Sequence, residues 1–219
     1  AFAVGRTQTL VYYLHRMIDD DLIPRVPVFV DSPLAINVTE IFRAHPECFD
    51  QEILSFMAHD PHGSALGFDL LSYTRSVEES KAINKVRGPA VIISASGMAE
   101  VGRILHHLRN NIHDPRNTIL ITSWMAPHTL GRRLAEGKKV VRIFGEKHEV
   151  GAQVVCINGL SSHADQTELL AYVLATKPSL RRVFLTHGEP DAAQALTEKL
   201  NQAGIHNVLY PKPGKRVEL

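Results

Sequence analysis

The stretch VPVFVDSPLAINVTEIFRAH, residues 26–45, decides the fold of this chain. It begins with an apolar run that ends at Asp31, and such a run is typical of a parallel strand buried on both faces. Ser32 and Pro33 follow, and these residue types are preferred at the N-cap and first position of a helix. A buried strand that passes directly into a capped helix predicts an α/β fold. Asp31 stands at the junction, where it could act as an acid at a strand end or form part of the helix cap.

Strands and helices alternate along the rest of the chain as well. Apolar runs and β-type patterning predict further strands at 1–4, 88–94, 118–123, 140–144, 149–159, 181–187 and 207–211. Apolar periodicity and capping patterns predict helices at 7–20, 76–88, 99–112, 127–137, 166–177 and 190–204. This alternation indicates α/β layers with a largely parallel sheet. The segment HDPRN, residues 113–117, predicts a boundary between an α/β unit over 1–117 and a second unit over 118–219. The tail KRVEL, residues 215–219, is expected to be one more strand.

The composition is that of an ordinary globular protein. The 219 residues are 44% hydrophobic and 21% charged, enough for one large domain or two modest ones. The formal net charge of +1 does not by itself indicate nucleic acid, although local patches could still bind it. Cys48 and Cys156 are too few for a disulfide framework, so buried free thiols in a reducing cytoplasm are expected. No apolar run approaches the roughly 18 residues that would span a membrane.

The segment SASGM, residues 94–98, follows a predicted strand and is expected to open a helix. Gly97 would let the backbone turn sharply toward a ligand, and Ser94 and Ser96 would add hydroxyl donors. Because a helix N-terminus presents free N–H groups, this segment predicts a phosphate site. An ordinary strand-to-helix turn explains the same residues equally well. No Gly-Lys-Ser/Thr sequence follows, so the segment is not a Walker motif.

Basic side chains on two predicted helices form a second candidate surface. Arg103, His106 and His107 share a helix face, and Arg132 follows a glycine on a later helix. These side chains could contact phosphates along a groove. For any single arginine, a solvated helix face is the simpler explanation.

Two histidines stand at the ends of predicted strands. His163 follows the strand that contains VVCI, and His187 ends the strand RVFLT. Functional groups gather at the carboxyl ends of strands in α/β sheets, so these histidines could converge. Imidazole suits zinc ligation or proton transfer near neutral pH, and Asp165 and Glu189 could orient the rings. The alternatives are a structural hydrogen bond for each histidine and a helix cap for Asp165.

Six short motifs spread over almost the whole chain carry a family resemblance. They are AFAVGRTQ (1–8), VDSPLA (30–35), SASGM with GRILHHL (94–98 and 102–108), TLGRRL (129–134), GLSSHAD (159–165) and THGEP (186–190). Together they resemble the β-CASP branch of the metallo-β-lactamase fold, a family of RNA- and DNA-processing nucleases. The resemblance implies a Rossmann-like β-CASP cap domain with a parallel sheet over 1–117. It implies that 118–219 is the C-terminal portion of a metallo-β-lactamase αββα fold, with the RNA-specificity segment.

The resemblance also implies roles for individual residues. His163 matches the family's second signature histidine, which sits beside the scissile phosphate as a proposed general acid. His187 matches the third signature histidine, a ligand of one of two zinc ions. SASGM, including Met98, matches a cap-domain loop that lines the groove for single-stranded RNA. The two zinc ions would activate water and hold the phosphate oxygens for in-line attack. The segment before TLGRRL departs from the family's usual sequence pattern. Trp124 in this segment could stack on a base or, as we expect, fill the core.

One departure from the family pattern limits what this chain could do alone. The main metal motif, His-x-His-x-Asp-His, is absent. In the family it precedes the cap insertion, so we expect a missing N-terminal lactamase half of a longer protein. His187 alone would not hold zinc, since such sites need three or four ligands. The isolated chain is therefore expected to be inactive, and a homodimer in the cytoplasm is compatible with this interpretation.

Two alternatives remain. The chain could belong to a non-catalytic RNA-binding or scaffolding member of the family, but retention of His163 and His187 argues against this. It could instead be an unrelated phosphate-binding α/β protein, which leaves SSHAD and THGE unexplained.

Overall fold

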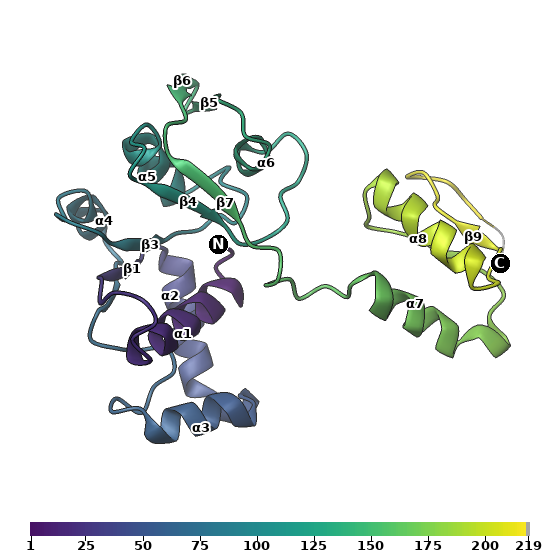
Figure 1. Ribbon diagram of the computed structural model, residues 1–219, viewed down its shortest axis with the longest axis horizontal. Helices are drawn as coiled ribbons and strands as arrows, with labels where there is room; N and C mark the ends of the chain where they lie inside the picture. The colour runs from purple at the N-terminus through teal and green to yellow at the C-terminus, as the bar shows by residue number, and fades with distance from the viewer. Residues whose placement is uncertain (218–219) are drawn as a thin grey trace. The chain divides into compact units, whose positions relative to one another are not determined.

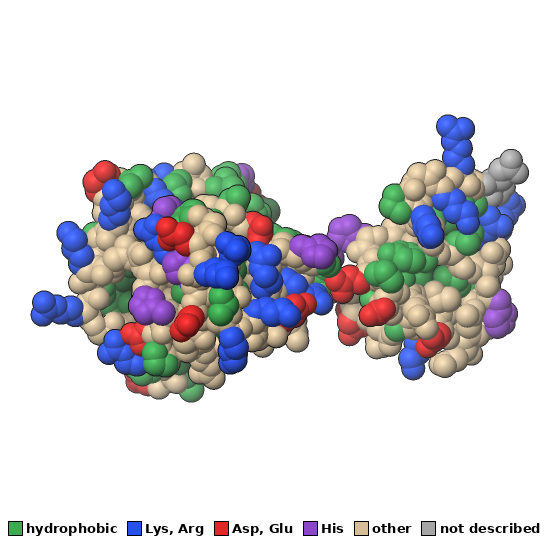
Figure 2. Space-filling model, turned by 90° about the horizontal axis from the view of Figure 1, so that it is seen from above, with side chains coloured by type: hydrophobic (Ala, Val, Ile, Leu, Met, Phe, Trp, Pro, Cys, Tyr) green, Lys and Arg blue, Asp and Glu red, His purple; other side chains and the backbone are tan. Residues whose placement is uncertain are grey.

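The computed structural model describes residues 1–217 (Figure 1). Contacts within the chain divide it into two compact units, one over 1–160 and one from Ser161 onward. In the view of Figure 2, Lys and Arg side chains are mixed with Asp and Glu side chains on both units, in line with the small formal net charge. None of the helices within residues 1–217 has the length and apolarity needed to cross a bilayer.

The first unit is built on a three-stranded parallel sheet in the order β2–β1–β3. The strands are β1 (Val28–Val30), β2 (Leu71–Tyr73) and β3 (Val91–Ile93). Val28 pairs with Leu71 on one side and Val91 on the other. Val28 and Val30 have no exposed surface, as a central parallel strand requires. The predicted α/β class with a parallel sheet is confirmed.

Four helices accompany this sheet: α1 (Arg6–Asp19), α2 (Pro33–Ala44), α3 (Gln51–His59) and α4 (Val77–Ile83), with the short 3-10 helix η1 (Pro46–Cys48) between α2 and α3. The start of α2 is confirmed, because Ser32 Oγ accepts a hydrogen bond from Ala35 N at 3.3 Å and Pro33 occupies the first position. The capping box of α4 is also confirmed, since Ser76 and Glu79 each cap the other's backbone N–H.

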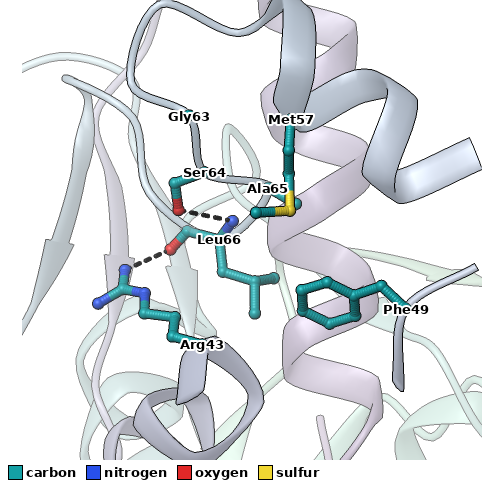
Figure 3. A pocket seen from close by; sticks show the side chains of 7 residues that line it. All are labelled: Arg43, Phe49, Met57, Gly63, Ser64, Ala65 and Leu66. Carbon is teal, nitrogen blue, oxygen red and sulfur yellow. Dashed lines mark hydrogen bonds between the residues drawn. The ribbon is translucent and has the colours of Figure 1, made fainter. Parts of the chain in front are cut away.

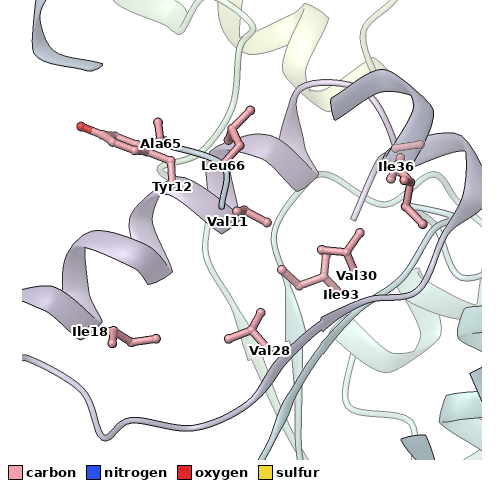
Figure 4. Packing of buried hydrophobic residues seen from close by; sticks show 11 residues of the cluster. Val11, Tyr12, Ile18, Val28, Val30, Ile36, Ala65, Leu66 and Ile93 are labelled. Carbon is pink, nitrogen blue, oxygen red and sulfur yellow. The ribbon is translucent and has the colours of Figure 1, made fainter. Parts of the chain in front are cut away.

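The loop that follows α3 is held in place by α2. Arg43 Nη2 donates to Leu66 O at 2.6 Å, and Leu66 N donates to Ser64 Oγ at 3.3 Å (Figure 3). Ala65 and Leu66 thereby enter the main apolar cluster. In that cluster they join Val11, Tyr12, Ile18, Val28, Val30, Ile36 and Ile93 (Figure 4).

Residues 1–4 do not form the predicted strand. The backbone N–H and the hydroxyl of Thr7 both donate to Phe2 O, at 3.2 and 2.8 Å. Gln8 Nε2 donates to Ala3 O at 3.2 Å. The start of α1 therefore uses the carbonyl groups that a neighbouring strand would need. Ala3 packs into the core, whereas Phe2 and Val4 are exposed.

The rest of the first unit carries a second apolar cluster. Its elements are α5 (Arg103–Asn111), β4 (Thr118–Ile121), α6 (Leu130–Ala135), β5 (Val140–Ile143), β6 (Glu146–Glu149) and β7 (Gln153–Cys156). β4 pairs with β7 in parallel, and β5 pairs with β6 as an antiparallel hairpin. The cluster includes Leu108 and Ile112 before the predicted boundary at 117 and Ile121 and Leu134 after it. Contacts thus join the two sides of residue 117, and the boundary there stays a prediction about the organisation of the sequence.

The second unit contains α7 (Gln166–Ala175), the 3-10 helix η2 (Lys177–Ser179), β8 (Val183–Phe184), α8 (Pro190–Gln202) and β9 (Val208–Leu209). β8 and β9 pair in parallel, and Val183, Leu200 and Ile205 form the buried centre. The predicted strand at 215–219 is wrong over 215–217, which have no regular secondary structure. Residues 218–219 lie outside the described part.

Cys48 and Cys156 are free, but both are exposed, so the expectation of buried thiols is wrong. Cys48 lies in η1, which contributes no buried residue, and Cys156 ends β7 on an exposed position. Their apolar or mixed sequence neighbours did not reveal which way each side chain faces.

Gly151 is the glycine that most strictly requires the absence of a side chain. A Cβ atom there would clash with the carbonyl of His113, while Gly151 N and Ala152 N both donate to Ile112 O. We expect Gly151→Ala to lower the free energy of unfolding by about 1–3 kcal/mol, because backbone atoms must move to relieve the overlap. Urea denaturation followed by circular dichroism measures this loss.

Gly159→Ala is the matched control, since a Cβ atom at Gly159 meets nothing within 4 Å. An equal loss of unfolding free energy in the two variants would contradict the close contact between Gly151 and the carbonyl of His113.

Candidate functional site

Asp31 stands directly after β1, has no exposed surface, and accepts four side-chain hydrogen bonds. Its Oδ1 accepts from Thr74 Oγ1 at 2.6 Å and from Arg103 Nη1 at 2.7 Å. Its Oδ2 accepts from Ser80 Oγ and from His107 Nε2, both at 2.6 Å. Ser32 forms the helix cap, so Asp31 is a buried polar centre and not part of that cap.

The charge of Asp31 is stabilised in the folded protein. Burial by itself would raise the pKa of Asp31. The four hydrogen bonds outweigh burial, with that from His107 contributing most, and hold the pKa of the carboxyl well below its usual range. Charge-assisted hydrogen bonds of this kind are roughly twice as strong as neutral ones.

The loop 94–102 departs from the expected phosphate cradle. The helix that SASGM was predicted to open begins only at Arg103, with Gly102 at its N-cap. Ser96 explains the delay, because its carbonyl accepts from Ala99 N at 3.1 Å and its hydroxyl accepts from Glu100 N at 3.2 Å. These bonds form a compact turn before the helix, so the prediction that SASGM presents a helix N-terminus is wrong.

The residues of SASGM face different surroundings. Ser94 is buried, and its hydroxyl donates to Asp31 O at 2.9 Å. Gly97 is also buried, and a Cβ atom there would lie 2.8 Å from the ring of Phe2. Ala95, Ser96 and Met98 are half-buried, so Ser96 and Met98 are the longer side chains of this segment that are not fully enclosed.

The predicted basic helix face is divided by the fold. Arg103 donates to Asp31, and also to Thr74 O at 3.1 Å and Arg75 O at 2.6 Å. His107 is buried against Asp31, whereas His106 is exposed. Two of the three side chains expected on one solvent face therefore bind within the chain.

Arg132 and Trp124 lie at the surface to different degrees. Arg132 is half-buried, and its Nε donates to Glu136 Oε1 at 2.8 Å. Trp124 is 57% exposed, so the expectation that it fills the core is wrong. The neighbouring Met125 occupies the core position instead, at 6% exposure.

His163 and His187 come together in the second unit. His163 lies in the loop before α7, and His187 follows β8. Their ring centroids are 6.3 Å apart, the ring planes meet at 26°, and both side chains are exposed. His187 has a left-handed backbone, with φ of 65°, and Tyr210 Oη donates to Gly188 O at 2.7 Å beside it. The two histidines thus converge in space although they are distant in sequence.

A shallow depression of about 630 Å³ surrounds His163. Its lining residues are Ser161, Ser162, His163, Ala164, Glu168, Leu169 and Tyr172. Asp165 and Glu168 form a capping box at the start of α7, with Glu168 N donating to Asp165 Oδ1 at 2.8 Å. The helix-cap interpretation of Asp165 is confirmed. Glu189 occupies the N-cap position of α8.

The donor set around the two histidines does not complete a zinc site. Within residues 1–217, no third His, Cys, Asp or Glu lies with His163 and His187 at coordinating distance. Two exposed imidazoles fall short of the three or four ligands that zinc requires. The described residues that do gather three such donors are His15, Asp19 and Asp60, which the sequence reasoning missed. The helical i, i+4 spacing of His15 and Asp19 was the available signal.

The fold and the site together define an α/β chain consistent with the C-terminal part of a metallo-β-lactamase fold. The family model of the Beta-Casp domain matches residues 7–134, and that of the Zn-dependent metallo-hydrolase RNA specificity domain matches residues 147–211. The chain belongs to the β-CASP family, as its motifs predicted.

Named relatives support a family of RNA-processing nucleases. A ribonuclease from Thermus thermophilus is 35% identical over 93% of this chain and 45% of its own length. A transcription termination factor from Methanosarcina mazei is 30% identical over 91% of this chain and 32% of its own length. An RNase J-like protein from Methanocaldococcus jannaschii is 29% identical over 86% of this chain and 42% of its own length. The chain spans less than half the length of each of these relatives.

Replacing the buried acid tests the polar centre. We expect Asp31→Asn to lower the free energy of unfolding at pH 7 by about 3–5 kcal/mol, because it leaves Arg103 and His107 without their carboxylate. The depressed folded-state pKa adds stability above the unfolded pKa of about 3.9, and this contribution is lost as the pH falls through that value toward the folded-state pKa. Urea titrations from pH 7 to pH 3 should show a larger loss of stability in the parent than in Asp31→Asn.

Asp114→Asn is the control. Hydrogen bonds from Arg116 lower the pKa of Asp114 to about 2, but this pair lies at the surface. Its replacement should cost much less, since exposed ion pairs contribute little. A similar loss in both variants would argue against a special role for burial at Asp31.

Proposed function

We propose that this chain is part of a zinc-dependent ribonuclease that hydrolyses phosphodiester bonds in RNA during processing or decay. The observation that carries the proposal is the convergence of His163 and His187 within the segment matched by the RNA specificity model. Two imidazoles that face one small region suit a single phosphate group better than two unrelated structural roles.

His163 is the proposed proton donor. During hydrolysis water attacks the phosphorus atom, and the bond from phosphorus to the leaving ribose oxygen breaks. A protonated imidazole beside that oxygen would supply the proton that it gains. The exposed ring of His163 and the open depression around it leave room for a nucleotide.

His187 is the proposed zinc ligand. Zinc, when bound, would activate the attacking water and hold the phosphate oxygens. Because the described chain offers too few ligands beside His187, we propose that two zinc ions bind only when a lactamase half preceding the cap completes the site. The isolated chain is then inactive. Glu189, close to His187 in sequence, and Asp165, close to His163, are the proposed positioning residues.

Single-stranded RNA is the proposed partner in a single groove. Within the first unit the proposed contacts are Ser96, Met98 and Arg132, which are half-buried, with Gly97 shaping the loop. Ser94 and Arg103 support this surface through Asp31 instead of contacting RNA directly. The exposed Trp124 adds a ring on which a base could stack. A cytoplasmic location and a homodimer complete the proposal.

The test compares this chain with a longer form that carries residues preceding Ala1. The longer form should hold about two zinc ions per chain, as family members with two-metal sites do, and should cleave single-stranded RNA. His163→Ala should lower the cleavage rate by about 10²–10⁴-fold with zinc content unchanged, because general acid catalysis contributes that much. His187→Ala should lower both the zinc content and the rate.

His206→Ala is the matched control, because His206 is another exposed histidine of the second unit. It should retain both zinc and activity. If the longer form binds RNA but holds no metal and does not cleave it, the nuclease proposal is wrong and a non-catalytic scaffold is the better interpretation.

A further inference from the structure

Three side chains of residue types that bind metal ions meet in the first unit. His15 and Asp19 lie one turn apart on α1, and Asp60 ends α3. His15 Nε2 is 3.3 Å from Asp19 Oδ2 and 3.2 Å from Asp60 Oδ1. The three donor atoms lie within 4.8 Å of one another.

The imidazole of His15 is fixed by aromatic rings. The side chain is 1% exposed, stacks on Phe68 at 4.7 Å with 21° between the planes, and meets the edge of Phe56 at 5.0 Å. His15 Nδ1 is buried without a hydrogen-bond partner. Ring packing therefore orients Nε2 toward the two carboxylates.

The carboxylate of Asp60 is aimed at His15 by its own loop. Its Oδ2 accepts from His62 N and from Ser64 N, both at 2.9 Å. The same loop is anchored further along by Arg43 and Ser64 (Figure 3). These bonds occupy one carboxylate oxygen and leave Oδ1 pointing to the imidazole.

Asp60 Oδ1 is a buried oxygen without a hydrogen bond. The Asp60 side chain has no exposed surface, and Oδ1 has no hydrogen-bond partner although His15 Nε2 is close by. A buried carboxylate oxygen without a donor is costly. Its closeness to the Nε2 atom of His15 and to a second carboxylate calls for a positive charge among the three atoms.

We propose that His15, Asp19 and Asp60 bind a divalent transition-metal ion of the Zn²⁺ type. Two ligands that bind tetrahedral zinc at about 2.0–2.1 Å lie roughly 3.3 Å apart, which is the spacing of His15 Nε2 from each carboxylate oxygen. One imidazole and two carboxylates form a donor set suited to zinc, with water in the fourth position. Since Asp19 is 40% exposed, the ion has a path from solvent. The ion clamps the end of α1 to the loop after α3.

A protonated His15 is the competing source of positive charge. It explains the geometry less well, because Asp60 Oδ1 lies nearest to Nε2 and still has no hydrogen bond. The unbonded Oδ1 of Asp60 shows that the nearer contact is not a hydrogen bond.

The experiment uses the full 219-residue chain with His163→Ala and His187→Ala, so that metal bound by these two histidines is removed. Co²⁺ serves as the probe, read by its visible absorption, with Zn²⁺ as competitor. We expect one Co²⁺ per chain and a rise in Tm on adding it, because an ion that binds only the folded state stabilises it. Asp60→Asn and Asp19→Asn should each weaken Co²⁺ binding by more than about tenfold, a loss that even indirect partners of metal ligands cause.

The matched control is His62→Gln with Asp69→Asn. This pair has the same 3.2 Å contact in the same loop, but it is exposed and lacks a third ligand. The control should bind Co²⁺ like the parent. Asp19→Asn keeps the test decisive if Asp60→Asn fails to fold, since Asp19 lies partly exposed on a helix; its Tm in EDTA should match that of the parent.

The proposal is overturned if the parent binds no Co²⁺ at millimolar concentration. It is also overturned if both ligand variants bind Co²⁺ as tightly as the parent.

Discussion

The carboxylate of Asp31 is the constraint around which the first unit is arranged. It stands at the end of the central strand β1 and receives bonds from residue 74 after β2, from α4 and from two side chains of α5. A buried charge is tolerated only when its hydrogen-bonding capacity is used, so these elements must meet at one point. Removing any donor leaves an imperfectly solvated charge, which ties the position of α5 to the sheet.

This arrangement changes the meaning of several residues that look like ligand contacts in the sequence. Arg103 and His107 have the spacing of a basic helix face, yet both bind Asp31. Ser94 has the setting of a phosphate-binding hydroxyl, yet it donates to Asp31 O. The first unit thus uses these polar side chains to join its own elements, and each of them is engaged within the chain.

The second unit carries the histidines of the family's motifs on a small scaffold. The capping box at Asp165 fixes the start of α7, and Tyr210 anchors the backbone next to His187. Both rings remain exposed, so the unit presents two imidazoles together at its surface.

Local sequence patterns determined the fold class, the buried strand β1, the caps at Ser32, Ser76 and Asp165, and the family with its two motif histidines. These features depend on residues within a few positions of one another, where backbone geometry and apolar periodicity act directly. The strand expected at 1–4 and the helix start expected at SASGM failed because side-chain and turn hydrogen bonds over three to five residues compete with the expected element. The burial expected for Trp124 failed because tertiary packing decides which side chain enters the core. Only the tertiary structure showed that the carboxylate of Asp31 collects four donors from three segments and that His15 meets Asp60. The physical reason is that the role of a buried polar side chain depends on the group that it bonds. A sequence does not show which distant groups meet in one buried site.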